Sequence, residues 1–360
     1  MSTLTQASQQ WASRPNDERF LSLTDMEQHF ALQREHSQAR VMNTRQVDFV
    51  PAEDNKGLML TAGGTEYNPT HFSFNQLCSL AESPAGFLRK LPSPYVADVL
   101  NYQLKYGRDV EDVGLLLYRN GSNELRAATG PRYGRIWNDD ILRGMTRLFG
   151  DGRTGDWKVP GEFGKEVEIT KRNTTLYAGD RDMFVFLADE KNRIEVPNRR
   201  NGESGLMARG FFIWNSEVGS TTFGISTFLF DYVCQNRIVW GAEDVKEIKL
   251  RHTASAPVKF LEEIQPALLT YSNASTANIV QGIEKARAAR LDNVDDFLAQ
   301  RYGKRMVEQL KTTHMLEENR PIETLWDVTT AVTARARSVQ YQDERVEIER
   351  DAGAVMRLAM

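Results

Sequence analysis

The feature that most constrains the fold is a pair of long, apolar, aromatic-rich segments in the middle of the chain. Leu206–Trp214 and Thr221–Val233 are dense in phenylalanine, tryptophan and β-branched residues, and turn-forming residues separate them. Such residues favour strands over helices. Shorter segments of the same kind lie on either side, at Thr174–Tyr177, Met183–Leu187 and Arg237–Trp240. We therefore expect an antiparallel sheet at the centre of the protein.

The N-terminal half combines a helix with a hairpin. Ser93-Pro94 is a helix-start signal, and apolar residues then recur at helical spacing, at Val96, Val99, Leu100 and Leu104. Strand-like runs lie on either side of Asn120-Gly121. They predict a hairpin, because Asn-Gly readily adopts the positive φ angles of a tight turn.

Helical spacing returns after Ser255-Ala-Pro257, with apolar residues at Val258, Leu261, Ile264 and Leu268. We therefore predict an α+β fold, with a central antiparallel sheet, N-terminal helices and a helical C-terminal unit. The predicted boundaries are an N-terminal arm and helix over 1–58, an α+β core with the antiparallel sheet over 59–255, and the helical unit over 256–360.

Composition and termini indicate the compartment. Cys78 and Cys234 lie far apart, which excludes a disulfide framework and favours a reducing environment. No signal-peptide pattern opens the chain, and the apolar stretches are too short to cross a bilayer. The formal net charge of -4 provides no global positive field. We expect a cytoplasmic protein with no membrane partner.

No motif for a nucleotide, a metal or catalysis stands out. Metal sites need clustered ligands, but the five histidines are scattered, at His29, His36, His71, His252 and His314. The nearest approach to a phosphate-binding loop, Gly161-Glu-Phe-Gly164-Lys165, lacks the four-residue spacer and the following Ser or Thr. The sequence therefore predicts no cofactor, no metal site and no catalytic residue, and it favours a protein that is not an enzyme.

What remains is a grouping of basic and aromatic residues. Guanidinium groups and rings alternate in Arg132-Tyr133-Gly-Arg135-Ile-Trp137, and residues 191–210 hold five cations against two acids. Arg199 and Arg200 lie in a Gly- and Asn-rich segment typical of a flexible loop. Single-stranded nucleic acid is held by such a combination, because cations follow the phosphates while bases stack on rings. The alternative is a solvated loop beside core aromatics. The candidate nucleic-acid-binding residues are Arg132, Tyr133, Arg135, Lys171, Arg172, Arg193, Arg199, Arg200, Arg209 and Arg237.

One stretch is more specific than these patterns. Gly210-Phe-Phe-Ile-Trp-Asn-Ser-Glu-Val-Gly219, followed by Thr222–Gly241, resembles the hallmark of the phage/plasmid-like proteins called domain of unknown function 932. Supporting matches are Phe74-Asn-Gln-Leu77, Ser83–Leu88, Arg132–Asn138 and Thr324–Asp327. The resemblance implies a mobile-element or prophage setting, but it brings no agreed activity and no catalytic residues.

Three functions are compatible with these patterns. The first is a nucleic-acid-binding protein, such as a single-strand annealing protein that works as a homo-oligomer. The second is a metal-dependent nuclease that uses Asp139, Asp140 and Asp231, whose carboxylates would have to lie within about 5 Å of one another to share an ion. The third is an interaction protein that binds a host factor through residues 256–360.

Overall fold

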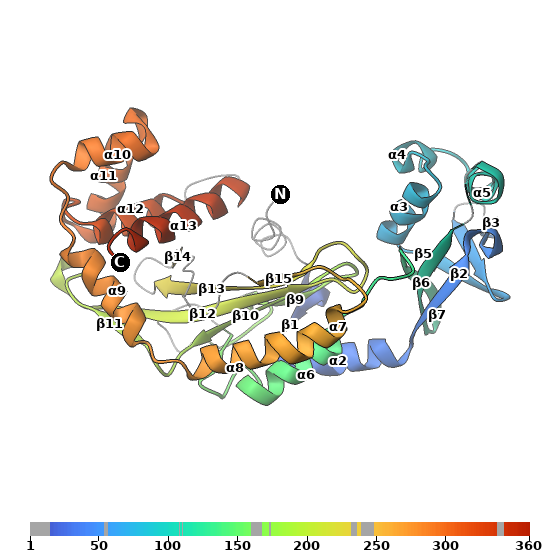
Figure 1. Cartoon of the computed structure of the whole chain (residues 1–360), viewed down its shortest axis with the longest axis horizontal. Coiled ribbons are helices and arrows are strands. Elements are labelled where there is room, and N and C mark those ends of the chain that lie inside the picture. Colours follow the sequence, from blue (N-terminus) through green and yellow to red (C-terminus); the bar gives the residue numbers. More distant parts are fainter. Residues whose placement is uncertain are drawn as a thin grey trace.

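The computed structural model describes residues 15–53, 57–107, 109, 111–159, 168–172, 174–231, 236–238, 248–336 and 342–360, with the backbone alone for 236–238 and 342–347. These residues form the predicted α+β fold. Three parts follow one another along the long axis of the molecule: a small barrel, a large central sheet and a helical bundle (Figure 1). The short 3-10 turn η1 (Asn16–Glu18) precedes them.

The two aromatic-rich segments form the longest strands of the central sheet, as predicted. These are β12 (Gly205–Asn215) and β13 (Phe223–Asp231), which pair antiparallel from Met207–Asp231 to Trp214–Gly224. The other strands of this sheet are β1 (Arg19–Phe20), β8 (Trp157–Lys158), β9 (Leu176–Ala178), β10 (Met183–Asp189), β11 (Ile194–Val196), β14 (Asn236–Ile238) and β15 (Ile248–Leu250). The main order is β1-β9-β10-β12-β13-β14, and every pairing described in it is antiparallel.

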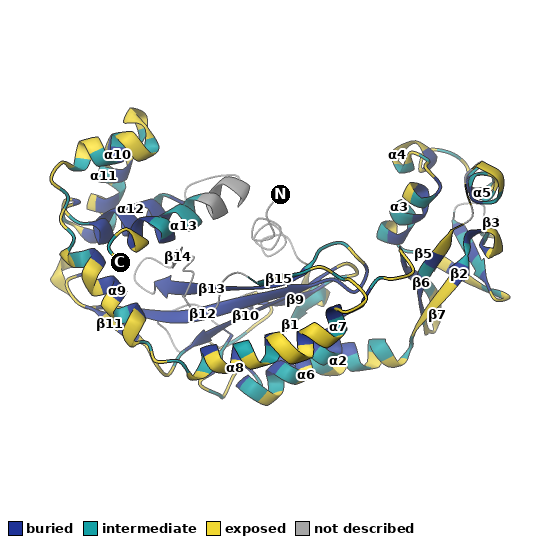
Figure 2. Ribbon diagram, in the orientation of Figure 1, coloured by how far each residue is buried: buried dark blue, intermediate teal, exposed yellow. Residues whose placement is uncertain are grey.

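Both faces of the central sheet are buried (Figure 2). One face packs its aliphatic and aromatic side chains against helices that lie beneath the sheet, namely α2 (Leu23–Glu35), α6 (Asn138–Phe149), α7 (Ala256–Lys259), η5 (Phe260–Ile264) and α8 (Gln265–Asn273). The other face is a cluster of rings: Tyr177, Phe184, Phe186, Phe212, Trp214, Phe228 and Phe230. A strand buried on both sides reads as a continuous apolar run, which is why β12 and β13 dominate the sequence.

Two glycines of the central strands are required by the rings opposite them. Gly224 pairs with Trp214, and a Cβ built on Gly224 would lie 1.9 Å from Cζ2 of that indole. Gly210 pairs with Phe228, and a Cβ there would lie 2.5 Å from Cζ of that ring. The rings therefore lie across bare backbone, so a larger residue at either position would displace them.

The N-terminal part forms a second sheet, which closes on itself. Its strands are β2 (Ser37–Asn43), β3 (Asp48–Pro51), β4 (Leu58–Ala62), β5 (Thr65–Pro69), β6 (Asp112–Asn120) and β7 (Ser122–Thr129), in the order β2-β6-β7-β5-β4-β3. The first and last strands of that order are joined in the chain by one 3-10 turn, η2 (Thr44–Gln46). All six strands contribute side chains to one core, so the sheet is a barrel.

The barrel has the topology of an OB-fold. If β2 and β3 count as one bent strand, it has five strands, and its neighbours are antiparallel except for the parallel pair β5–β7. Helices lie between the third and fourth strands: α3 (His71–Leu80), α4 (Ala85–Leu88), α5 (Ser93–Tyr102) and the π-helical turn η3 (Gln103–Gly107). We call residues 71–107 the barrel cap. A five-stranded, partly open Greek-key barrel is the architecture named OB.

The predicted hairpin and helix both occur in this barrel. The turn between β6 and β7 is Gly121, whose φ of 76° lies in the region that glycine adopts without strain. The predicted helix begins at Ser93 and continues through η3. Its predicted apolar positions Val96, Leu100 and Leu104 are buried.

The C-terminal bundle consists of α9 (Ala277–Ala288), α10 (Val294–Tyr302), α11 (Lys304–Glu318), α12 (Leu325–Ala336) and α13 (Gln342–Arg357). Its core is continuous with the end of the central sheet through Met207 and Leu229. Among the described residues, no helix combines the length and the apolar character needed to cross a bilayer.

The packing places the part boundaries differently from the prediction. The barrel spans residues 37–129 and so continues across position 58. Helices α7 to α8 belong to the core beneath the central sheet rather than to the bundle, because they bury Phe260, Ile264, Leu268 and Tyr271 there. The predicted apolar face of that helix is partly wrong, since Val258 and Leu261 are more than half exposed.

Candidate nucleic-acid interface

The Arg-Tyr-rich motif at 132–137 lies against the loop that follows β12. The Tyr133 hydroxyl donates to the Ser216 carbonyl at 2.8 Å, and its ring stacks on His252 with centroids 4.8 Å apart. Arg135 Nε donates to the Glu217 carbonyl at 2.8 Å, and its guanidinium lies over the rings of Tyr133 and Trp137. These stacks are internal, so the motif holds the β12–β13 loop rather than presenting free rings to a ligand.

A buried ion pair joins the barrel to this loop. Arg126 of β7 lies 3.0 Å from Glu217, and their side chains are 6% and 2% exposed. The other oxygen of Glu217 accepts from the backbone N–H of Asn138, at the first residue of α6. Gln76 of α3 also donates to the Val218 carbonyl at 2.7 Å. The two motifs singled out in the sequence, 132–138 and 210–219, therefore form one structural joint.

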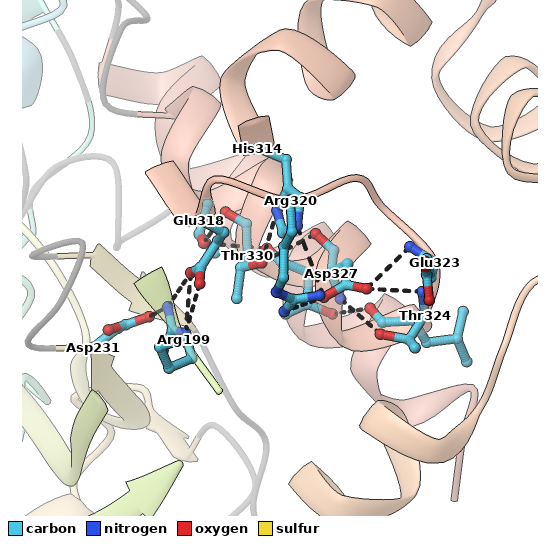
Figure 3. Close-up of polar contacts among 12 residues, drawn as sticks. Arg199, Asp231, His314, Glu318, Arg320, Glu323, Thr324, Asp327 and Thr330 are labelled. Carbon is cyan, nitrogen blue, oxygen red and sulfur yellow. Dashed lines mark hydrogen bonds and ion pairs between the residues drawn. The ribbon is translucent and has the colours of Figure 1, made fainter. Parts of the chain in front are cut away.

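The sequence predicts that Arg199 lies on an exposed flexible loop. That prediction is wrong, because the residue is only 1% exposed. Figure 3 shows its guanidinium between Asp231 at the end of β13 and Glu318 near the end of α11. The distances are 2.8 Å to Asp231 and 2.5 Å to Glu318, and the Trp326 ring lies 5.6 Å away. Burial alone would lower the pKa of Arg199, but the two carboxylates more than offset it, so the pKa is raised. Arg199 fastens the bundle to the sheet.

Next to Arg199 in Figure 3 lies a threonine–histidine–aspartate arrangement. His314 Nδ1 is 3.4 Å from Thr330 Oγ1, and its Nε2 is 3.8 Å from Asp327 Oδ1. The side chains of His314 and Asp327 are 0% and 1% exposed, and Thr330 is buried with them. A substrate cannot reach a nucleophile in this position, so the arrangement is structural. Asp327 also accepts from the Glu323 and Thr324 N–H groups at 3.0 Å, which caps α12.

Arg209 is likewise bound by groups of the protein itself. Its Nε donates to Asp189 at 2.9 Å, and its Nη atoms donate to the carbonyls of Tyr271, Ser272 and Ala274 at the end of α8. It borders a cavity of about 740 Å³ whose rim includes Lys191. Lys191 is itself paired with Asp156 at 2.9 Å. The cations of this cavity are therefore already bound by protein groups.

The remaining candidates are dispersed. Arg132, Lys171, Arg172 and Arg200 are exposed, and Lys171 donates to the Asn16 carbonyl at 2.9 Å. Arg193 pairs with Glu190, with Nε at 3.0 Å from Oε2. Arg237 is in β14, but its side chain is outside the described part of the chain, as is Cys234. Among the nine candidates whose side chains are described, carboxylates and carbonyls of the fold bind several, including Arg135, Arg193, Arg199 and Arg209.

The three acids proposed for a nuclease cannot share an ion. Asp139 follows Asn138, whose side chain bonds Asn215 at one end of β12. Asp231 pairs with Met207, eight residues away along the same strand, a separation of roughly 26 Å. Asp139 and Asp140 are also paired with Arg34. Within the described ranges, no group of three or more His, Cys, Asp or Glu side chains could hold a metal ion.

A different surface carries free rings. Among the described residues, the exposed large aromatic side chains are all in the barrel cap: Phe87, Tyr95, Tyr102 and Tyr106, at 58%, 63%, 63% and 77% exposed. Tyr95, Tyr102 and Tyr106 follow at intervals of seven and four, which places them on one side of a helix. The Tyr102 and Tyr106 rings are 5.9 Å apart. We call these three residues the tyrosine face.

The tyrosine face is oriented by the opposite side of the same helix. Asn101 bonds both backbone groups of Phe49 at 2.8 Å, which ties α5 to β3. Val96, Leu100 and Leu104 are buried in the barrel core. The tyrosines must therefore point away from the barrel. The outer sides of β4 and β5, by contrast, present Met59, Thr61, Glu66 and Asn68, with no ring or cation at these positions.

Sequence reasoning missed this surface, although the signal was available. The predicted apolar side of the helix implies an outward side at positions 95, 98, 102 and 106, and three of these four residues are tyrosine. Large rings on the solvent side of a helix gain little from burial, so a row of them is a candidate binding surface.

Comparisons of the chain with protein-family models, curated proteins and solved structures found no match. The resemblance to the phage and plasmid family therefore stays a prediction. The conclusions about function depend on the barrel and on the chemistry of its cap.

Proposed function

We propose that the protein binds single-stranded nucleic acid through the tyrosine face of the barrel cap. The observation that carries the proposal is the row of Tyr95, Tyr102 and Tyr106, exposed by 63–77% on one side of a helix. Unpaired bases stack on such rings, and each stack is worth about 1–3 kcal/mol. Bases within a duplex are already stacked on one another, so the same surface would discriminate against double strands.

The barrel supports this proposal by analogy. OB-type barrels commonly bind oligonucleotides or oligosaccharides, although a fold alone does not establish a function. In this barrel the outer side of β4 and β5 lacks rings and cations, whereas the cap holds rings together with Arg89 and Lys90. The inserted helices are therefore the better surface for a polyanion.

Stacking rather than charge should supply most of the affinity. The cap contributes Arg89 and Lys90, while Lys105 is paired with Asp48. Even two phosphate contacts on a single strand would give a slope of only about -1.4 in log K against log salt, so we expect a slope no steeper than that. Asp98 lies on the same side of the helix as the tyrosine face, and its negative charge would repel phosphate. Asp98→Asn should therefore strengthen binding.

The decisive experiment replaces the three tyrosines. A fluorescein-labelled oligonucleotide of about 12 bases, a typical site size, is titrated with the wild type and with the variant Tyr95→Ala/Tyr102→Ala/Tyr106→Ala, and anisotropy is recorded. Because each lost stack is worth about 1–3 kcal/mol, the variant should bind at least about a hundredfold more weakly. Leu316→Ala removes a side chain that is 72% exposed in α11 and serves as the matched control.

Two results would contradict the proposal: equal affinity of the wild type and the triple variant, or equal affinity for single strands and duplex. Absence of binding to either nucleic acid at micromolar protein would favour a protein partner for the tyrosine face. The mobile-element setting, strand annealing and homo-oligomer assembly remain predictions from the sequence. Annealing is checked separately, by the rate at which two complementary labelled strands pair with and without the protein.

A further inference from the structure

A cavity of about 400 Å³ lies between the barrel and its cap. Leu58 of β4 and Leu88 and Val96 of the cap provide apolar walls, and Asn68, His71 and Arg89 provide polar ones. Sites for small molecules have this volume and this mixture of apolar walls with a few polar groups. Ser93 and Val96, which line it, lie on the buried side of α5, opposite the tyrosine face.

Arg89 is held as a flat surface at this cavity. Its Nη1 donates to Asn75 Oδ1 at 2.8 Å and its Nη2 to the His71 carbonyl at 2.9 Å. The guanidinium lies 4.8 Å from the centroid of the Phe74 ring. Two hydrogen bonds and one stack fix the plane of the group in advance, while the side chain remains exposed. A fixed, exposed guanidinium plane is a surface on which a nucleobase stacks.

Two further side chains can bind the edge of a planar ligand. Asn68 and His71 are both exposed, and within the described residues neither side chain has a hydrogen-bond partner. An amide and a neutral imidazole can each donate and accept, as can the Watson–Crick edge of a base. The cavity therefore offers a plane, an apolar wall and two groups able to bind an edge.

We propose that this cavity receives one nucleobase, stacked on Arg89 and bound at its edge by Asn68 and His71. The inference rests on the proposed function, because the base would belong to a strand stacked on the tyrosine face that continues round the N-terminal end of α5 to reach the cavity. The base in the cavity would give the protein a dependence on base identity that the tyrosines alone do not provide, since every base has a stacking face.

The test separates the plane of Arg89 from its charge. Arg89→Lys keeps the cation but removes the plane, and Arg305→Lys makes the same change at an exposed arginine of α11, outside the cap. Each variant is titrated with a labelled oligoadenylate of about 12 nucleotides and with an abasic strand of equal length. We expect Arg89→Lys to lose about tenfold in affinity for the oligoadenylate, with no change in affinity for the abasic strand or in salt slope, and Arg305→Lys to bind both strands like the wild type.

Equal loss on both strands would reduce Arg89 to a phosphate contact and overturn the inference, as would wild-type affinity of Arg89→Lys. His71→Ala should reduce the preference among adenine, cytosine and thymine strands, and an unchanged preference would also overturn it. Unchanged thermal unfolding establishes that each variant is folded.

A second readout keeps the cavity distinct from the tyrosine face. Saturation-transfer NMR with adenosine monophosphate should show base contacts with the wild type and with the triple tyrosine variant, but not with Arg89→Lys. If the wild type binds the nucleotide but no oligonucleotide, the proposed function is contradicted, while the assignment of the cavity as a nucleobase site is supported. If the tyrosine substitutions weaken oligonucleotide binding but the nucleotide does not bind, the proposed function is supported and the assignment of the cavity as a nucleobase site is contradicted.

Discussion

Loss of one charge from the buried ion pair between Arg126 and Glu217 should destabilise the protein strongly. Glu217→Gln keeps the oxygen that accepts from the Asn138 N–H. It removes the counter-ion of Arg126, whose side chain is only 6% exposed. At 3.0 Å and an effective dielectric constant of about 20, the attraction is about 5–6 kcal/mol. Removing one partner of a buried pair costs about 3–5 kcal/mol. That is a large part of a typical unfolding free energy of about 5–15 kcal/mol.

The loss of unfolding free energy is measured by unfolding the protein in urea while tryptophan fluorescence is monitored. The double variant Arg126→Met/Glu217→Gln removes both charges, keeps the oxygen that accepts from the Asn138 N–H, and should recover at least half of it, because no uncompensated buried charge is left. Glu195→Gln changes an exposed carboxylate of β11 and should stay within about 0.5 kcal/mol of the wild type. The reasoning is refuted if Glu217→Gln also stays within that range, or if the double variant is as unstable as the sum of its two singles.

Two other perturbations have defined outcomes. Gly224→Ala places a methyl group against the Trp214 ring and should destabilise the protein by about 1–3 kcal/mol, seen as a lower Tm, whereas wild-type stability would show that the ring can move freely. Burial lowers the pKa of His314 and of His252 to about 4 each. The unfolded chain then binds more protons between about pH 6.5 and pH 4, so unfolding free energy should fall as pH drops through that window, by up to about 3 kcal/mol for His314. His314→Asn should flatten this dependence, and an unchanged slope would contradict the assignment.

The central sheet was predictable because the information is local. β12 and β13 are buried on both faces, so fifteen of their twenty residues are apolar or glycine, and no distant contact is needed to recognise them as strands. The barrel was not predictable in the same way. Its closure depends on the parallel pairing of β5 with β7, which lie far apart in sequence. It also depends on the bend at Thr44–Gln46, because the strand on one side of it pairs with β6 and the strand on the other side pairs with β4.

Arg199 illustrates why the site prediction failed where it did. In sequence it lies among glycines and asparagines, which are typical of a solvated loop. The carboxylates that bind it are 32 and 119 residues away, and no local pattern announces them. Tyr102 is the opposite case, because the helix phase set by Val96, Leu100 and Leu104 already assigns it to the solvent side. No run of arginines adjoins Tyr102 in the sequence, so the helix phase alone identifies it.

The most direct test of the account is to locate the bound strand. The wild-type protein is irradiated with a single-stranded oligonucleotide that carries photoreactive bromouracil, digested, and the cross-linked peptide is identified by mass spectrometry. Cross-links to the segment that contains Tyr95, Tyr102 and Tyr106 are the expected result. Cross-links confined to residues 132–137 or 191–210, or none under conditions where binding is saturated, would contradict the claim that the barrel cap holds the strand.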